Sequence, residues 1–150
     1  MDTLGALGKA VLISNFLRYH RLVTYLSRQT DKPIGLPIGL VRLRDVMDEK
    51  FYTRSPPAAS WESLGQLFKN GAKLYVYPSL DKKTGVLTTV ENMEVAPHLR
   101  HLYQHLVENK FVENIPNYNA DALKIYSGEV LAKIHSGDES LSKLIPAPIF

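Results

Sequence analysis

The 150-residue sequence contains no cysteine. Disulfide bonds, zinc sites built from thiolates, iron–sulfur clusters and cysteine nucleophiles are therefore excluded. The absence is typical of proteins from a reducing compartment. The zinc-binding pattern H-E-x-x-H is missing as well. We expect neither a bound metal nor a cofactor.

Long apolar runs are also missing. No stretch of about 18 apolar residues occurs, so the sequence predicts no membrane-spanning helix and no membrane contact. The N-terminus carries Asp2 and has no basic region ahead of its apolar part, which makes it a poor signal peptide. We therefore predict a cytoplasmic protein. Met1 lies close to an apolar segment and the chain stops at Ile149 and Phe150, so we expect a fragment of a longer protein.

The sequence has little excess charge of either sign. Lys and Arg number 18 and Asp and Glu number 15, which gives a formal charge of +3. The basic residues are spread among acidic ones, and this argues against a nucleic-acid-binding protein. Apolar residues make up 45% and charged residues 22%, as in ordinary globular proteins. The length suits one domain with a hydrophobic core, and we expect a single domain over residues 1–150.

The stretch from Lys9 to Gln29 carries the clearest structural signal. Residues 10–13 are four consecutive apolar residues, which is typical of a central strand in a parallel sheet that is covered on both faces. Ser14 and Asn15 favour the N-cap position of a helix. We therefore predict a buried strand over residues 10–14 and a helix that begins near Phe16. Such a corner is where α/β folds usually hold a ligand.

Further strands and helices alternate along the chain. The predicted strands cover residues 34–38 and 73–77, with short additions within 86–90 and 111–115. The predicted helices cover residues 40–48, 60–69, a segment that starts at Pro97, and 128–136. Pro37 cannot donate a hydrogen bond, so we expect its strand to be short, bulged or at an edge of the sheet. The alternation predicts an α/β domain of the three-layer, Rossmann-like kind, with a short, mostly parallel sheet and helices on both faces.

The last predicted helix, 128–136, has an apolar face that we expect to point inward. Its residues are Val130, Leu131 and Ile134, and Gly137 follows as the terminating residue. A helix with such a face normally packs it against the core of the domain.

The predicted ligand site lies at the corner after the first strand. Free backbone N–H groups at a helix start attract anions, and Arg18, one turn in, can pair with a phosphate or carboxylate. Gly39, after the second predicted strand, would let backbone N–H groups face the same crevice as Ser14 and Asn15. The corner has no G-x-G-x-x-G or P-loop pattern. Helix capping with a surface arginine explains Ser14, Asn15 and Arg18 more simply.

Three histidines share one side of the helix that starts at Pro97. His98, His101 and His105 lie at i, i+3 and i+7, opposite a leucine seam. His101 and His105 have a spacing that can bind a metal ion, and a histidine in a crevice can act as an acid or base. No carboxylate stands at a fixed ligand spacing, so a solvated polar face is the simpler interpretation. We keep His98 and His101 as candidate ligand-binding residues and assign no catalytic residue.

Four segments taken together resemble a known family: VLISNFLRYHRLVTYLSRQT, ESLGQLFKNGAKLYVYP, VAPHLRHLYQHLVENKFVENI and SGEVLAKIHSGD. They are similar to the C-terminal part of longer bacterial and fungal proteins that are labelled nicotinamide or nicotinate mononucleotide adenylyltransferase-like. The resemblance implies a role in nucleotide-linked metabolism. The chain lacks the G-x-F-x-P-x-H-x-x-H and I-S-x-T-x-x-R segments that adenylyltransferases of this kind need, so no catalytic residue carries over.

Two functions from different classes remain. The first is an α/β domain of a nucleotide-handling protein that binds a nucleotide or another small anionic ligand. The alternative is a non-catalytic interaction or assembly domain, because no catalytic motif is present and apolar residues stand at the ends of the chain. Its partner would be a second copy of the chain or the missing part of a longer one.

Overall fold

The computed structural model describes Gly5, residues 8–48, 58–69 and 71–138, Ser140 and Leu144, with the backbone alone for residues 58–61. The chain divides into two compact units. The smaller unit takes residues 1–15 and 119–150, and the larger unit takes residues 16–118. The interpretation of Met1, Ile149 and Phe150 as cut ends lies outside the described residues. A single domain over residues 1–150, taken from a longer protein, stays a prediction.

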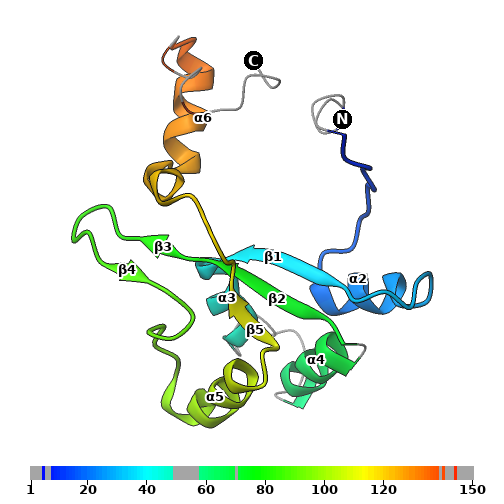
Figure 1. The fold of residues 1–150 in the computed structure, drawn as a ribbon. Coiled ribbons are helices and arrows are strands. Elements are labelled where there is room, and N and C mark those ends of the chain that lie inside the picture. The colour runs from blue at the N-terminus through cyan, green and yellow to red at the C-terminus, as the bar shows by residue number, and fades with distance from the viewer. Residues whose placement is uncertain are drawn as a thin grey trace. The chain divides into compact units, whose positions relative to one another are not determined.

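The larger unit is built on a three-stranded parallel sheet (Figure 1). The strands are β1 (Gly35–Gly39), β2 (Lys73–Tyr77) and β5 (Val112–Asn114), and β2 lies in the centre. The strands predicted over 34–38, 73–77 and 111–115 are therefore confirmed. Because β1 is an edge strand, Pro37 takes the position that its missing N–H predicts. The larger unit is thus of the mixed α/β class with a mostly parallel sheet.

In the described residues of the larger unit, four helices and one 3₁₀ turn precede or separate these strands along the chain. They are α2 (Tyr19–Leu26), α3 (Leu40–Met47), α4 (Ala58–Lys69), η2 (Pro97–Leu99) and α5 (Arg100–Glu108). The helices predicted over 40–48, over 60–69 and from Pro97 are confirmed, and Pro97 takes the first position of its helical turn.

A small hairpin follows β2. Strand β3 (Ser79–Leu80) pairs antiparallel with β4 (Leu87–Thr88), which confirms a short strand within residues 86–90. The connecting turn is closed by Asp81, whose Oδ1 accepts hydrogen bonds from the N–H of Lys83 at 2.9 Å and of Thr84 at 2.7 Å. These bonds favour the charged carboxylate and lower the pKa of Asp81.

The two faces of the sheet differ in polarity. Residues that are paired in register in a parallel sheet share a face, and Leu36, Leu74 and Val112 are paired in this way. That face is apolar and joins buried residues of all four helices in one core, including Val23, Leu43, Leu67 and Leu106. Tyr75 lies on the opposite face, which is exposed or half-buried, and its ring covers Gly35.

The order of the strands explains this one-sided core. The chain moves across the sheet in one direction, from β1 to β2 to β5, and right-handed crossovers in one direction place their helices on the same face. The described residues of this unit thus put one helical layer on the apolar face. The second layer of a Rossmann-like domain stays a prediction.

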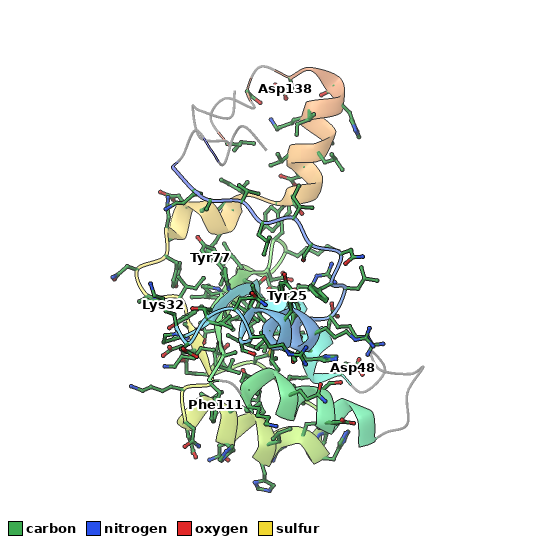
Figure 2. All side chains as sticks on the ribbon, turned by 90° about the vertical axis from the view of Figure 1, so that its right-hand side faces the viewer. Tyr25, Lys32, Asp48, Tyr77, Phe111 and Asp138 are labelled. Atoms are coloured by element: carbon green, nitrogen blue, oxygen red, sulfur yellow. The ribbon has the colours of Figure 1, made fainter. Side chains whose placement is uncertain are left out.

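Aromatic packing ties α4 and α5 to the same edge of the sheet. The ring of Phe111, just before β5, lies 5.3 Å from that of Phe68 in α4 and 6.4 Å from that of His105 in α5, measured between ring centroids. Figure 2 labels Phe111 on the side of the unit where these helices lie. This contact joins helices that are more than 30 residues apart in the sequence.

The predicted buried strand over residues 10–14 is wrong. These residues form no strand, and Leu12 and Ile13 are 67% and 69% exposed. The helix predicted to begin near Phe16 is α2, which begins at Tyr19; its N-cap is Arg18 with an extended backbone, so neither Ser14 nor Asn15 caps it. A short apolar run indicates only that burial of its side chains would be favourable. It does not show that neighbouring strands are present to bury them.

The smaller unit contains η3 (Ala120–Lys124) and α6 (Ser127–Ser136), so the helix predicted over 128–136 is confirmed. Gly137 ends α6 in a left-handed conformation with φ of 67°, as a C-terminal glycine usually does. The inward position predicted for Leu131 and Ile134 is wrong, because both are exposed, while Val130 is half-buried. Helical periodicity predicts an apolar face, but no residue of α6 becomes buried within the described part of the chain.

Candidate functional site

The four residues predicted to form a ligand crevice lie in different environments. Ser14 and Asn15 belong to the exposed, irregular segment of the smaller unit. Arg18 is the N-cap of α2, and Gly39 is both the last residue of β1 and the N-cap of α3. Since these two residues belong to the larger unit, a crevice formed by all four stays a prediction.

The three histidines lie on the surface of the larger unit. His98 is in η2, His101 and His105 are in α5, and all three are exposed. The described residues contain no group of three or more side chains that could hold a metal ion. His98 lines a cavity of about 410 Å³ with neighbours that include Arg44, Asp48 and Glu94, whereas His101 is not among its lining residues. His98 and His101 are therefore not brought together in this cavity.

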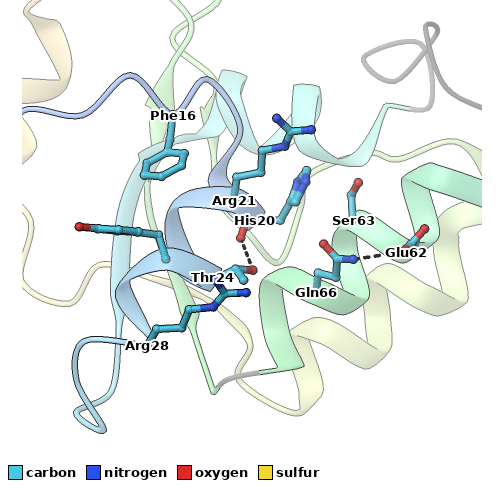
Figure 3. Close-up of a pocket in the computed structure, with 9 residues that line it drawn as sticks. Phe16, His20, Arg21, Thr24, Arg28, Glu62, Ser63 and Gln66 are labelled. Carbon is cyan, nitrogen blue, oxygen red and sulfur yellow. Dashed lines mark hydrogen bonds between the residues drawn. The ribbon is translucent and has the colours of Figure 1, made fainter.

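A pocket lined mainly by polar side chains lies between α2 and α4 (Figure 3). Its volume is about 490 Å³. From α2 it receives Arg21 and Thr24, which stand at i and i+3 and therefore share one helix face, and Arg28 follows in the turn after the end of α2 at Leu26. From α4 it receives Glu62, Ser63 and Gln66, and Phe16, His20 and Tyr25 complete the lining. We call this the α2–α4 pocket.

Positive charge dominates the α2–α4 pocket. Arg21 and Arg28 each contribute a guanidinium, and within the described part of the chain neither forms an ion pair. In the part of the lining that the structure describes, Glu62 supplies the one carboxylate, and its Oε1 accepts a hydrogen bond from Gln66 Nε2 at 3.0 Å. Two cationic groups against one anionic group leave the pocket suited to an anion.

His20 adds a neutral imidazole to this lining. Partial burial lowers the pKa of His20, and the nearby charges of Arg18 and Arg21 lower it further, while Glu62 raises it. A histidine whose pKa lies below its usual 6.5 is uncharged at neutral pH and can both donate and accept a hydrogen bond. The helix holds it in place, and Thr24 Oγ1 donates to the backbone carbonyl of His20 at 2.8 Å.

Two aromatic rings also line the α2–α4 pocket. The centroids of Phe16 and Tyr25 are 5.3 Å apart, with their planes inclined at 39°. Both side chains are exposed, so part of each ring is available to a ligand. Exposed aromatic rings beside guanidinium groups can stack on the planar base of a nucleotide.

Sequence patterns point to the arginines of this pocket but not to the residues that α4 contributes. Arg21 and Arg28 stand at i and i+7, a spacing that would place both on one face of a helix, although α2 ends at Leu26, before Arg28. The contribution of α4 could not be found in this way, because α2 and α4 are more than 30 residues apart and only their packing joins them.

Comparisons with models of protein families, with curated proteins and with solved structures find no match to this chain. No helix in the described residues is both long enough and apolar enough to span a bilayer. A cytoplasmic location stays a prediction. The function must therefore be inferred from the geometry of the cavities themselves.

Proposed function

We propose that residues 16–118 form a nucleotide-handling α/β unit that binds a nucleotide or a related small anionic ligand in the α2–α4 pocket. The observation that carries this proposal is the combination of Arg21 and Arg28 in the lining of one pocket with the exposed ring pair of Phe16 and Tyr25. Guanidinium groups recognise phosphate by paired hydrogen bonds, and aromatic rings recognise a base by stacking. The pocket volume of about 490 Å³ lies within the usual range of small-molecule sites.

The separation of the two arginines favours a ligand with more than one anionic or polar group. Arg21 lies in α2 and Arg28 in the turn after it, so the two guanidinium groups come from different parts of the pocket lining. A single phosphate would contact one of them fully. A diphosphate, with a nucleoside at one end, would reach both and place its base beside Tyr25.

The proposal includes a Rossmann-like architecture and an adenylyltransferase-like relationship. The parallel sheet and the helices between its strands support a Rossmann-like fold. The α2–α4 pocket lies between two helices, whereas ligands of Rossmann-like folds usually bind beyond the carboxyl ends of the strands. Because the adenylyltransferase motifs are missing, the proposed role is ligand binding, with no adenylyl transfer by this chain alone.

Replacing Arg21 by alanine should weaken nucleotide binding about tenfold or more. A hydrogen bond to a charged group contributes about 1.5–3 kcal/mol, and Arg21 offers its guanidinium without competition from an ion pair in the described residues. Isothermal titration calorimetry with ADP and AMP measures the effect. The same change at Arg28 should weaken ADP more than AMP.

The matched control is Arg42→Ala. Arg42 is an exposed arginine of α3 that pairs with Asp45 at 2.9 Å and does not line the pocket. Its replacement removes the same charge from the protein and should leave nucleotide affinity within twofold. Equal affinities of the Arg21 and Arg42 variants, or no binding of any nucleotide by the unaltered chain, would contradict the proposal.

A second candidate function is an interaction or assembly domain. It is favoured by three consecutive exposed apolar residues of the smaller unit, Val11, Leu12 and Ile13, whose side chains are 40%, 67% and 69% exposed. Neighbouring exposed apolar side chains are typical of protein-binding surfaces. If this surface joins two copies of the chain, sedimentation equilibrium should show a dimer that Ile13→Ser weakens at least tenfold. A monomer at all concentrations would contradict assembly through a second copy.

A further inference from the structure

A second cavity in the larger unit has a different lining. It lies between α5 and residues 90–97, has a volume of about 720 Å³ and shares no lining residue with the α2–α4 pocket. Its floor is formed by Val90, Met93 and Tyr103, each at most 7% exposed. Half-buried Val95 and Val107 extend this apolar surface. We call the cavity the acidic groove, for the rim described below.

Hydrogen bonds hold the floor of the acidic groove in place. The hydroxyl of Tyr103 donates to the backbone carbonyl of Val90 at 2.7 Å, and Asn114 Oδ1 accepts from the N–H of Val90 at 3.0 Å. Burial raises the pKa of Tyr103 to about 12, so its hydroxyl is neutral under physiological conditions. The floor therefore offers a ligand an apolar, uncharged surface that is already formed.

The rim of the groove carries mainly negative charge. Glu91, Glu94 and Glu108 line it, and among the described lining residues Arg100 carries the one positive charge. Two of the carboxylates are held by neighbours. Asn114 Nδ2 donates to both oxygens of Glu91 at 2.7 and 2.6 Å, and Gln104 Nε2 donates to Glu108 at 2.8 Å. Fixed carboxylates lose little side-chain entropy when they bind a cation.

We propose that the acidic groove binds a small organic cation with an apolar body, such as an arylalkylamine. The apolar floor would cover the body of the ligand, and the glutamates of the rim would receive its ammonium group. A cavity of about 720 Å³ is of the size that holds a small molecule, and one lysine side chain of a partner protein would leave most of it unfilled. The charge of the rim disfavours the anionic ligand proposed for the α2–α4 pocket.

The test compares two probes of similar size and opposite charge. Phenethylammonium and 3-phenylpropionate are titrated separately into the full chain, and binding is followed by calorimetry and by protein-observed NMR. We expect the ammonium compound to bind and the carboxylate to bind at least tenfold more weakly. The NMR signals of Val95 and Val107 should shift with the amine, which locates it in the groove.

Variants of the rim give the second part of the test. Each of Glu94→Gln and Glu108→Gln should weaken the amine up to about fivefold, the effect of one partly exposed ion pair. Glu62→Gln, which removes the same charge from the α2–α4 pocket, should leave amine affinity unchanged. Equal binding of both probes, or unchanged amine affinity in both rim variants, would overturn the proposal. So would binding of a lysine-containing peptide by a chain that does not bind phenethylammonium.

Discussion

Replacing Leu74 by alanine should lower the free energy of unfolding by about 3–5 kcal/mol. Leu74 is fully buried in the central strand β2, where its register partners are Leu36 in β1 and Val112 in β5. Removing three carbon atoms there leaves a cavity between both neighbouring strands and the helices above them. The rigid strands on either side prevent the site from collapsing, which places the cost toward the upper end of the usual range. Urea unfolding followed by circular dichroism measures it.

Leu17→Ala is the matched control for this prediction. It removes the same atoms from a side chain of the same unit that is 95% exposed, so the free energy of unfolding should change by less than about 0.5 kcal/mol. A similar loss of stability in both variants would show that Leu17 is buried in solution. Little change in either variant would show that the sheet is not the core of the cooperative unit.

The central strand β2 could be predicted from the sequence because its own residues alternate between apolar residues that become buried and residues that stay half-buried. In Lys73–Tyr77, Leu74 and Val76 alternate with half-buried residues, and Pro78 follows as a stop. The helix from Pro97 is a similar case. Leu99, Tyr103 and Leu106 follow the helical repeat and are all buried. In both elements the local periodicity and the tertiary contacts agree, so the prediction needed no knowledge of the partner element.

The prediction of a strand over residues 10–14 was wrong for the opposite reason. Residues 10–13 are apolar throughout, and an apolar run without alternation does not identify which element covers it. The ligand site predicted at Ser14 and Asn15 was based on this strand and stays a prediction. The start of α2 was placed too early as well, because Ser14 and Asn15 are good capping residues by type, yet the helix begins after Arg18.

Neither cavity could be predicted from a local pattern. The α2–α4 pocket needs two helices to pack together, and the acidic groove needs residues 90–97 to fold against α5. That segment has no periodic signal. It is positioned by Tyr103 and Asn114, which bind Val90 across 13 and 24 residues of sequence. Such contacts depend on the finished fold, so they appear only with the structure.

Asn114 should be the polar residue whose replacement has the largest effect on stability. Its Oδ1 accepts from the N–H of the fully buried Val90, and its Nδ2 donates to the carboxylate of Glu91. Asn114→Ala leaves the N–H of Val90 without this acceptor, which should cost about 1–3 kcal/mol in urea unfolding at pH 7. Asn109→Ala, an exposed asparagine whose amide donates to the His105 carbonyl at 2.8 Å, should cost less than about 1 kcal/mol.

Asn114 should also affect how the free energy of unfolding depends on pH. Hydrogen bonds from Thr89 and Asn114 lower the pKa of Glu91 below its ordinary 4.5. A carboxyl with a lowered native pKa stabilises the fold above its unfolded pKa, and this contribution is lost as the pH falls through the native value. Stability should therefore fall from pH 5 to pH 3 in the unaltered chain, and the fall should be shallower in Asn114→Ala.

Asn114→Asp separates the acceptor role of this side chain from its donor role. The aspartate keeps an oxygen for the N–H of Val90, but it loses the amide that donates to Glu91 and places a second carboxylate beside the first. Two adjacent carboxylates repel when both are ionised, and the repulsion disappears when one is protonated and donates to the other. Asn114→Asp should therefore be much less stable than the unaltered chain at pH 7, and the difference should shrink by pH 4. A difference that does not change with pH would show that Glu91 and residue 114 are not in contact, and the rim of the acidic groove would then lack its fixed carboxylate.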